Sequence, residues 1–278
     1  MDCVYCGYTR VIRYGTRGGV QQYLCKGCGR QFNERSGTLF AGMKYTPEEV
    51  ALALRLKFSY RLSCREASEL MASLGHPISP ATILLWIKRF SDSFQTLQRT
   101  YRPEYSGIWH LDELHVKLRG GKGYVYAVED EHRNVIALEL TWRKDEEATA
   151  RVLRKAREEA GFTPDIVVSD GATAYPPAIE EAIPGARHVV AQFKGTLVSH
   201  DGRPVTVSNN LLERLNGTLR GWVRTLRGFK SLEAGNRALT ILQAVYNLLR
   251  PHQGLGGLTP FQASGGGGLT WSILSKSL

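Results

Sequence analysis

The sequence predicts an α/β protein whose largest domain is a mixed β-sheet flanked by helices, preceded by a small cysteine-rich unit and a helical unit. Three observations predict this class: two Cys-x-x-Cys pairs near the start, three helix-start signals in the next segment, and a strand-rich third segment. In the third segment three consecutive strands precede alternating helices and strands, which is typical of a mixed sheet covered on both faces. The predicted domains are residues 1–38, 44–98, 105–262 and a glycine-rich linker with a short tail, 263–278.

Composition restricts the class of function. The chain has 278 residues, of which 42% are apolar and 22% charged, and its formal net charge is +10. That excess indicates a polyanionic partner, with nucleic acid first, and four thiolates binding one Zn²⁺ would lower it by only two units. No apolar run approaches the roughly 18 residues of a membrane span, and the first residues lack the apolar core of a signal peptide. We therefore expect a cytoplasmic protein with no membrane contact.

The cysteine-rich unit carries the spacing of a zinc ribbon. Its two pairs are separated by the 18 residues 7–24, and each pair is followed directly by a glycine. Each pair can supply two thiolates to one tetrahedral Zn²⁺, and the residues between them can form a short hairpin. A redox dithiol is the competing interpretation, although a lone redox motif does not show two such pairs. Cys64 lies outside the pattern and is expected to be a small buried side chain. The predicted ligands of one structural zinc ion are Cys3, Cys6, Cys25 and Cys28.

The helical unit has three explicit helix starts, at Thr46, Ser63 and Ser79. The first two have a glutamate three residues later, and the first and third are followed by proline at the first helical position. Short helices with tight turns on a basic chain suggest a helix-turn-helix in which residues 79–94 form the recognition helix. A plain helical linker is the alternative. The recognition helix is expected to bury Ile83, Trp86, Ile87 and Phe90 and to expose Thr82, Lys88 and Arg89 toward DNA.

The third segment supplies the sheet. Runs rich in β-branched and aromatic residues, separated by glycine, asparagine or charged turns, predict strands, and a capped amphipathic pattern predicts a helix between them. In chain order we expect strands at 107–119, 123–131 and 134–142, a helix at 144–161, a strand at 165–171, a short helix at 175–185, a strand at 187–193, a hairpin around 200–204 and a helix from 209.

The helix that begins near residue 209 has two distinct stripes. Leucines and Trp222 recur on one stripe at a helical period, and the adjacent stripe holds Glu213, Gly217, Arg220, Arg224 and Arg227. A simple interpretation is available, because Asn210 followed by Glu213 is a capping-box signature and arginines can form a solvated face. The stripes therefore predict the buried side, and leave the purpose of the glutamate open.

Two aspartates lie where a sheet can bring them together. Asp112 alternates with Ile108 and His110 on one strand face, whereas Glu113 points to the opposite face. Asp170 ends a strand, at the edge where open α/β sheets bind their ligands. With Glu213 they offer the hard oxygen donors that Mg²⁺ prefers. For Asp112 an ion pair with a buried arginine, and for Asp170 a turn cap, are the alternatives.

Four stretches carry a resemblance to a known family: "HLDELHVKLRGGKGYVYAVED", "VVSDGATAYPPAI", "NNLLERLNGTLRGWVRTLRGFKS" and "YNLLRPHQGLGGLTPFQA". Over roughly residues 105–262 the chain resembles the catalytic domain of DDE transposases from prokaryotic insertion sequences. The resemblance implies an RNase H-like fold, with Asp112, Asp170 and Glu213 as the catalytic acids that hold two Mg²⁺ or Mn²⁺ ions. It also implies double-stranded DNA as partner, contacted by Arg220, Arg224, Arg227 and Lys230.

The implied reaction is cleavage of a phosphodiester bond at a transposon end, followed by joining of the 3'-hydroxyl to target DNA by two-metal-ion catalysis. A homodimer or larger assembly on DNA, in a nucleoid-associated setting, is implied too. The 42 residues from 171 to 212 exceed the interval in the most compact relatives, with the excess placed in the hairpin, so the subfamily stays open. The alternatives are a domesticated, non-catalytic DNA-binding regulator and an RNase H-like nuclease without strand transfer.

Overall fold

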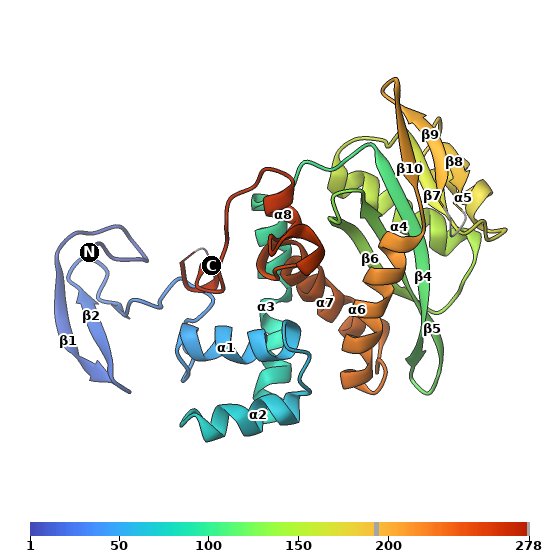
Figure 1. Ribbon diagram of the computed structural model, residues 1–278. Coiled ribbons are helices and arrows are strands. Elements are labelled where there is room, and N and C mark those ends of the chain that lie inside the picture. The colour runs from blue at the N-terminus through green and yellow to red at the C-terminus, as the bar shows by residue number, and fades with distance from the viewer. Residues whose placement is uncertain (192–194, 277–278) are drawn as a thin grey trace. The chain divides into compact units, whose positions relative to one another are not determined.

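The structure is a computed structural model that describes residues 1–191 and 195–276 (Figure 1). It divides into two compact units, residues 1–53 with 271–278, and residues 54–270. The domain limits drawn from the sequence remain a prediction, because compactness alone does not test them. Among the described helices, none is both long and apolar enough to cross a membrane.

The first unit contains a small antiparallel sheet in the order β1-β2-β3, formed by β1 (Val11–Arg17), β2 (Val20–Cys25) and β3 (Gln31–Phe32). The hairpin predicted between the two cysteine pairs is therefore present. The buried cluster beside this hairpin contains Cys3, Cys25 and Phe32, with two half-buried neighbours. A core of this size cannot stabilise a fold by itself, so a further stabilising element is required. The tail ends in α9 (Ile273–Lys276), in which Leu274 is fully buried.

The three predicted helix starts are confirmed by α1 (Pro47–Phe58), α2 (Cys64–Ser73) and α3 (Pro80–Thr100). Ser63 and Glu66 form a reciprocal capping box, and Thr46 and Glu49 bond each other's backbone N–H in the same way. Ser79 accepts a hydrogen bond from the backbone of Thr82. Each cap satisfies a backbone donor that the first helical turn leaves unpaired. Cys64 is half-buried rather than buried, because it is the first residue of α2.

Helix α3 is longer than expected. It continues past residue 94 to Thr100, and Phe94 and Leu97 extend the buried stripe of Ile83, Trp86, Ile87 and Phe90. The added turns pack against α7 (Leu232–Ala244), where the Gln98 side chain donates to the carbonyl of Thr240 at 3.2 Å. Two signals for this end were present in the sequence, Arg99 in the last turn and Pro103 three residues beyond it, and the predicted end did not use them.

The second unit is built around a five-stranded sheet with the order β6-β5-β4-β7-β8. The pairs β4–β5 and β5–β6 are antiparallel, whereas β4–β7 and β7–β8 are parallel, so the predicted mixed sheet is confirmed. Residues 192 and 193 of the strand predicted at 187–193 lie outside the described residues. The strands are β4 (Ile108–Leu118), β5 (Gly121–Asp130), β6 (Val135–Thr141), β7 (Ile166–Ser169) and β8 (Arg187–Val190).

Helices cover both faces of this sheet (Figure 1). On one face, α4 (Glu146–Ala160) and α5 (Tyr175–Ala182) bury Trp109 and Leu111 in the main core. The other face meets α6 (Asn210–Leu226), α7 and the hairpin of β9 (Thr196–His200) with β10 (Arg203–Val207). The chain then continues through a π-helix (Val245–Leu249), a 3-10 turn (Gln253–Leu255) and α8 (Pro260–Ala263). Alternate residues of β4 therefore face different helix layers.

The end of α1 is attached to α6 within the second unit. The rings of Phe58 and Trp222 stack with centroids 5.4 Å apart. Lys57 is completely buried, and its ammonium group donates to Thr225 Oγ1 at 2.9 Å. Burial lowers the pKa of Lys57. A buried lysine is tolerated only where polar or π partners compensate it, and here Thr225 and the Trp222 ring do so.

Candidate active site

Asp112 and Asp170 are brought together by the parallel pairing of β4 and β7. That pairing sets Ile108 opposite Ile166 and His110 opposite Val168. Continuing the same register by two residues sets Asp112 opposite Asp170, directly beyond the end of β7. Neighbouring strands are about 4.8 Å apart, and residues two apart share a face. The two carboxylates therefore lie side by side on neighbouring strands.

The carboxylate of Asp112 is half-buried and held by two hydrogen bonds. Its Oδ1 accepts from the backbone N–H of Glu113 at 2.8 Å, and its Oδ2 accepts from the side-chain amide of Asn216 at 2.6 Å. Burial, together with the negative charges of Glu113 and Asp170, raises the pKa of Asp112 to about 6. No arginine pairs with it among the described residues, so the buried-arginine alternative is wrong. The site has an excess of negative charge.

Asp170 follows the last residue of β7 and opens a tight turn. Gly171 has φ +84°, and a Cβ atom there would lie 2.8 Å from the Val190 side chain. Only glycine fits this position without strain. The Oδ1 atom of Asp170 accepts from the backbone N–H of Ala172 at 3.1 Å, so the residue does cap its turn. One carboxylate oxygen is occupied in this way, and the side chain remains exposed.

Glu213 lies in the first turn of α6, but it does not form the predicted capping box. The N-cap residue is Asn209, which makes no side-chain cap bond and instead donates to the Ala191 carbonyl at 3.2 Å. Because the helix begins at Asn210, Glu213 is the fourth helical residue, one position beyond the third residue that a capping box uses. Its side chain is exposed, without a hydrogen bond or ion pair among the described residues. Capping therefore does not explain this carboxylate.

Asn216 is a site residue that sequence reasoning missed. It lies three residues after Glu213 on α6, is 4% exposed, and joins that helix to Asp112 on β4. Its Oδ1 atom is buried without a partner. The available signal was a polar residue adjoining the leucine stripe at i+3 from Glu213, which places both on one side of the helix. Glu213 thus lies one turn from the residue that contacts Asp112.

The three acids are close without forming a single tight cluster. Among the described residues, the side-chain groups whose ligand atoms all lie within 4.8 Å are the four cysteines and Asp165 with His200 and Asp201. Asp112, Asp170 and Glu213 are not such a group. Asp112 and Asp170 are strand neighbours. Glu213 lies on α6, one helical turn before Asn216, the residue that bonds Asp112.

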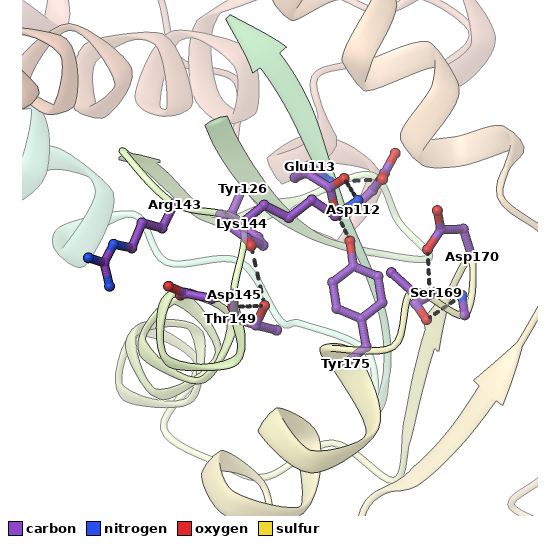
Figure 2. A network of polar contacts seen from close by, with 12 residues as sticks. Asp112, Glu113, Tyr126, Arg143, Lys144, Asp145, Thr149, Ser169, Asp170 and Tyr175 are labelled. Atoms are coloured by element: carbon purple, nitrogen blue, oxygen red, sulfur yellow. Dashed lines mark hydrogen bonds and ion pairs between the residues drawn. The ribbon is translucent and has the colours of Figure 1, made fainter. Parts of the chain in front are cut away.

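Glu113 occupies a separate network on the opposite face of β4 (Figure 2). Tyr175 donates its hydroxyl to Glu113 Oε2, and Lys144 forms an ion pair with Oε1. The Glu113 side chain is only 5% exposed. Burial, followed by the bond to Glu113, raises the pKa of Tyr175 far above its usual range. Glu113 therefore has Lys144 as its cationic partner, whereas Asp112, on the other face, has none among the described residues.

The basic residues of α6 border a cavity beside the acids. It has a volume of about 320 Å³ and is lined by β4 residues 114–117 and by α6 and the turn after it. Arg220, Arg224 and Arg227 contribute to the lining, and all three are exposed. None of them pairs with a carboxylate among the described residues. We call this cavity the β4–α6 groove.

Of the four other residues predicted to contact DNA, three are exposed and one is half-buried. Lys88, Arg89 and Lys230 lie on the surface. Thr82 does not, because it is half-buried and its hydroxyl bonds the Ser79 hydroxyl at 2.9 Å as part of the α3 cap. Leu84 and Leu85, which the sequence analysis did not single out, are 55% and 64% exposed on the same helix.

The four cysteines of the first unit form the geometry of a zinc site. Cys3 and Cys28 have sulfurs 3.7 Å apart, and those of Cys6 and Cys25 are 3.6 Å apart. A regular tetrahedron with Zn–S bonds of about 2.3 Å has sulfurs about 3.8 Å apart. Backbone N–H groups of Cys28 and Gly27 donate to Cys25 Sγ and lower the pKa of that thiol to about 7. The residues present therefore fit a zinc ion.

Comparison with known proteins gives the family. A family model described as a DDE domain, of the IS240 transposase type, matches residues 106–252. The chain is 20% identical over 191 residues to the transposase for insertion sequence-like element IS431mec of Staphylococcus aureus, covering 66% of this chain and 84% of the relative. It is 28% identical over 257 residues to an uncharacterized protein in transposable element ISH50 of Halobacterium salinarum, covering 81% and 79%.

Among solved structures, the HTLV-2 integrase catalytic core domain in complex with magnesium matches with a TM-score of 0.41 and 19% identity. This match covers 58% of the present chain and 97% of the integrase chain. The family model is the stronger finding, because it spans more than half of the chain and contains the whole stretch from Asp112 to Glu213. The chain belongs to the DDE-domain family, the DDE transposases of insertion sequences.

Proposed function

We propose that this enzyme cleaves phosphodiester bonds at transposon ends and joins the freed 3'-hydroxyl to target DNA, with Asp112, Asp170 and Glu213 as the catalytic acids. The observation that supports the proposal is their lack of cationic partners: no ion pair neutralises any of the three among the described residues. The adjacent Glu113 is paired with Lys144 and Tyr175. A cluster of unpaired carboxylates beside a basic groove fits cation-dependent chemistry on a polyanion.

The three acids would hold two Mg²⁺ or Mn²⁺ ions. Carboxylate oxygens are the donors that these cations prefer. Burial, and then the charges of Glu113 and Asp170, raise the pKa of Asp112, and a bound divalent cation would stabilise its charged form. When bound, such ions stabilise the attacking and leaving oxygens of an in-line displacement. Asn216 would orient Asp112 through its amide bond, and the arginines of α6 would hold the DNA backbone.

The order of reactions assigns no covalent role to the protein. A water molecule would first attack the phosphorus at the transposon end, breaking the P–O3' bond on that strand and freeing the 3'-hydroxyl. That hydroxyl would then attack a phosphorus of the target strand and displace its 3'-oxygen. The number of phosphodiester bonds is unchanged in the second step, so joining needs no energy source.

Strand-transfer product from a labelled end substrate tests this function. Asp112→Asn, Asp170→Asn and Glu213→Gln should each abolish cleavage and joining while end binding persists, because only charge at the acids is lost. Glu180→Gln, an exposed acid on α5, is the control and should keep full activity. Cleavage without joining in wild type would favour the nuclease alternative, and binding without cleavage the regulator.

The remaining partners are proposals of the same kind. We propose one structural Zn²⁺ at Cys3, Cys6, Cys25 and Cys28, and DNA contacts from Lys88, Arg89 and Lys230. Two transposon ends must be joined in one reaction, so a homodimer or larger assembly on DNA fits the chemistry. Sedimentation of the protein with and without end DNA measures that assembly.

A further inference from the structure

We propose that the β4–α6 groove binds one unstacked nucleotide of the DNA end, with its base against an apolar floor and its phosphate against the arginines. The inference rests on the proposed function and adds a binding site to it. The groove begins beside the acids, because Leu114 and Val116 share the strand face of Asp112. It therefore lies next to the position of the scissile phosphate.

The groove is a built feature of the fold. Beyond the end of β7, the edge of β4 has no neighbouring strand until Phe229, whose backbone bonds Lys117 and Arg119 at 2.8 Å each. Gly228, with φ +94°, lies so close to β4 that a Cβ atom would meet the Lys117 backbone oxygen at 3.0 Å. Only glycine permits that approach. The far end of the groove is thereby fixed to the strand that carries Asp112.

The side chains that line the groove favour a whole nucleotide over a bare backbone phosphate as its ligand. Val116 and Val223 are half-buried and provide apolar surface, which a phosphodiester chain cannot use, whereas Leu114 in the same lining is only 3% exposed. A base can pack there, as bases that leave the helical stack do in apolar pockets. Arg220, Arg224 and Arg227 supply guanidinium groups, which stack on base planes and bind phosphate oxygens in pairs. A volume of about 320 Å³ is at the lower end for pockets that hold small organic ligands.

The position of the nucleotide follows from strand geometry. Leu114 and Val116 are two and four residues beyond Asp112, which is about 7 to 13 Å along the strand. Stacked nucleotides advance about 3.4 Å each, so the bound base should be two to four nucleotides from the scissile phosphate.

End duplexes with 2-aminopurine at each of the first five nucleotides on either side of the scissile phosphate test the proposal. Fluorescence is recorded on binding, before any divalent ion is added, and cleavage is then measured on the same sample. We expect brightening at one position, two to four nucleotides from the cut. A mismatch at that position should tighten binding by about tenfold, because the pair no longer resists opening.

Val223→Phe, which fills the groove, should remove both the brightening and the mismatch effect, while Val223→Ala, which leaves it open, should keep both. Thermal unfolding shows whether each variant is folded, and the mismatch series on wild type needs no variant. No brightening and no mismatch effect at any position, in protein that cleaves, would overturn the proposal and leave the groove a backbone contact. Brightening without cleavage would support the site while contradicting the proposed function.

Discussion

At the residue scale, the clearest finding is that a side chain from α6 holds the carboxylate of Asp112. Asn216 donates to its Oδ2 atom at 2.6 Å from a position that is 4% exposed. A hydrogen bond to a charged group contributes about 1.5–3 kcal/mol, and misplacing a reacting group by an ångström can cost about 100-fold in rate. Asn216 is therefore expected to be a positioning residue.

We predict that Asn216→Ala lowers the cleavage rate by about 10- to 100-fold with end binding unchanged. Asn216→Asp should be more harmful than Asn216→Ala, because it places a second carboxylate against Asp112. Single-turnover cleavage, with thermal unfolding as the check on folding, measures the difference. Equal activity in both variants and wild type would mean that the amide only fills space.

The second prediction concerns Glu113, the acid next in sequence to Asp112. Glu113→Gln should retain cleavage within about tenfold, because the residue faces Tyr175 and Lys144 on the other side of the sheet. The free energy of unfolding should fall by about 1–3 kcal/mol, since a nearly buried carboxylate loses its ion pair. Denaturant titration measures that loss. A Glu113→Gln enzyme as inactive as Asp112→Asn would contradict the assignment of strand faces.

A buried glutamate predicts a pH dependence of stability. Glu129 is 1% exposed, Tyr246 donates to its Oε1 atom at 3.2 Å, and burial raises its pKa from 4.5 to about 8. The folded protein holds a proton that the unfolded chain releases, so stability falls as pH rises through this window. Burial lowers the pKa of His110, opposite Glu129 on β4, from 6.5 to about 4, which gives the opposite slope below pH 6.5.

We therefore predict that the effect of Glu129 is measurable from pH 6.5 to about 8, where the opposing contribution of His110 fades as the histidine of the unfolded chain loses its proton. Wild type should lose stability there with a slope of up to about 1.4 kcal/mol per pH unit, and Glu129→Gln should remove most of it. Unfolding by denaturant at several pH values gives the slopes, with Glu180→Gln as the exposed control. A slope that survives in Glu129→Gln would assign it to another group.

At the scale of elements, the next prediction concerns the ribbon that carries the four cysteines and the zinc ion proposed for it. Its buried cluster is too small to fold alone, and its four sulfurs are spaced for one tetrahedral ion. Protein purified without chelator should contain one Zn²⁺ per chain, and a chelator should unfold this element while residues 54–270 stay folded. Metal analysis and thermal unfolding measure the two effects. Zinc-free protein with an intact ribbon would contradict this account.

Element types and faces could largely be predicted, because periodicity and caps are local. The stripe of α6 predicted five buried side chains: Leu212, Leu215, Leu219 and Trp222 are buried, and Leu226 is half-buried. Strand order also placed Asp112 beside Asp170. The predictions that failed concerned the exact first residue of a helix and a contact between residues far apart in the sequence. The start of α6 differed by one residue and removed the capping box, and the bond between Asn216 and Asp112 joins residues 104 apart. A pattern indicates which face is buried, without indicating its partner.

At the scale of the whole molecule, the two sides of α6 make different contacts. One side carries Glu213, Asn216 and the arginines of the β4–α6 groove. The other side carries Trp222, and the adjoining Thr225 binds Lys57 at the end of α1. The end of α1 therefore contacts the side of α6 that faces away from Glu213. Sequence could not reveal this link, since Lys57 and Thr225 are 168 residues apart.

The last prediction concerns the side of α6 that carries the three arginines. Arg220, Arg224 and Arg227 are exposed and form no ion pair within the described part of the chain, so replacing all three with glutamine should remove phosphate contacts and leave the fold intact. Each lost contact should lower the slope of log affinity against log salt by about one unit, on any duplex. Preference for the transposon end should persist, because phosphate contacts carry no sequence information and the end is expected to be read by residues 1–98. Titrations at several salt concentrations on end and random duplexes measure both quantities. An unchanged slope would mean that the arginines are only a solvated face, and loss of preference alone would mean that α6 reads bases.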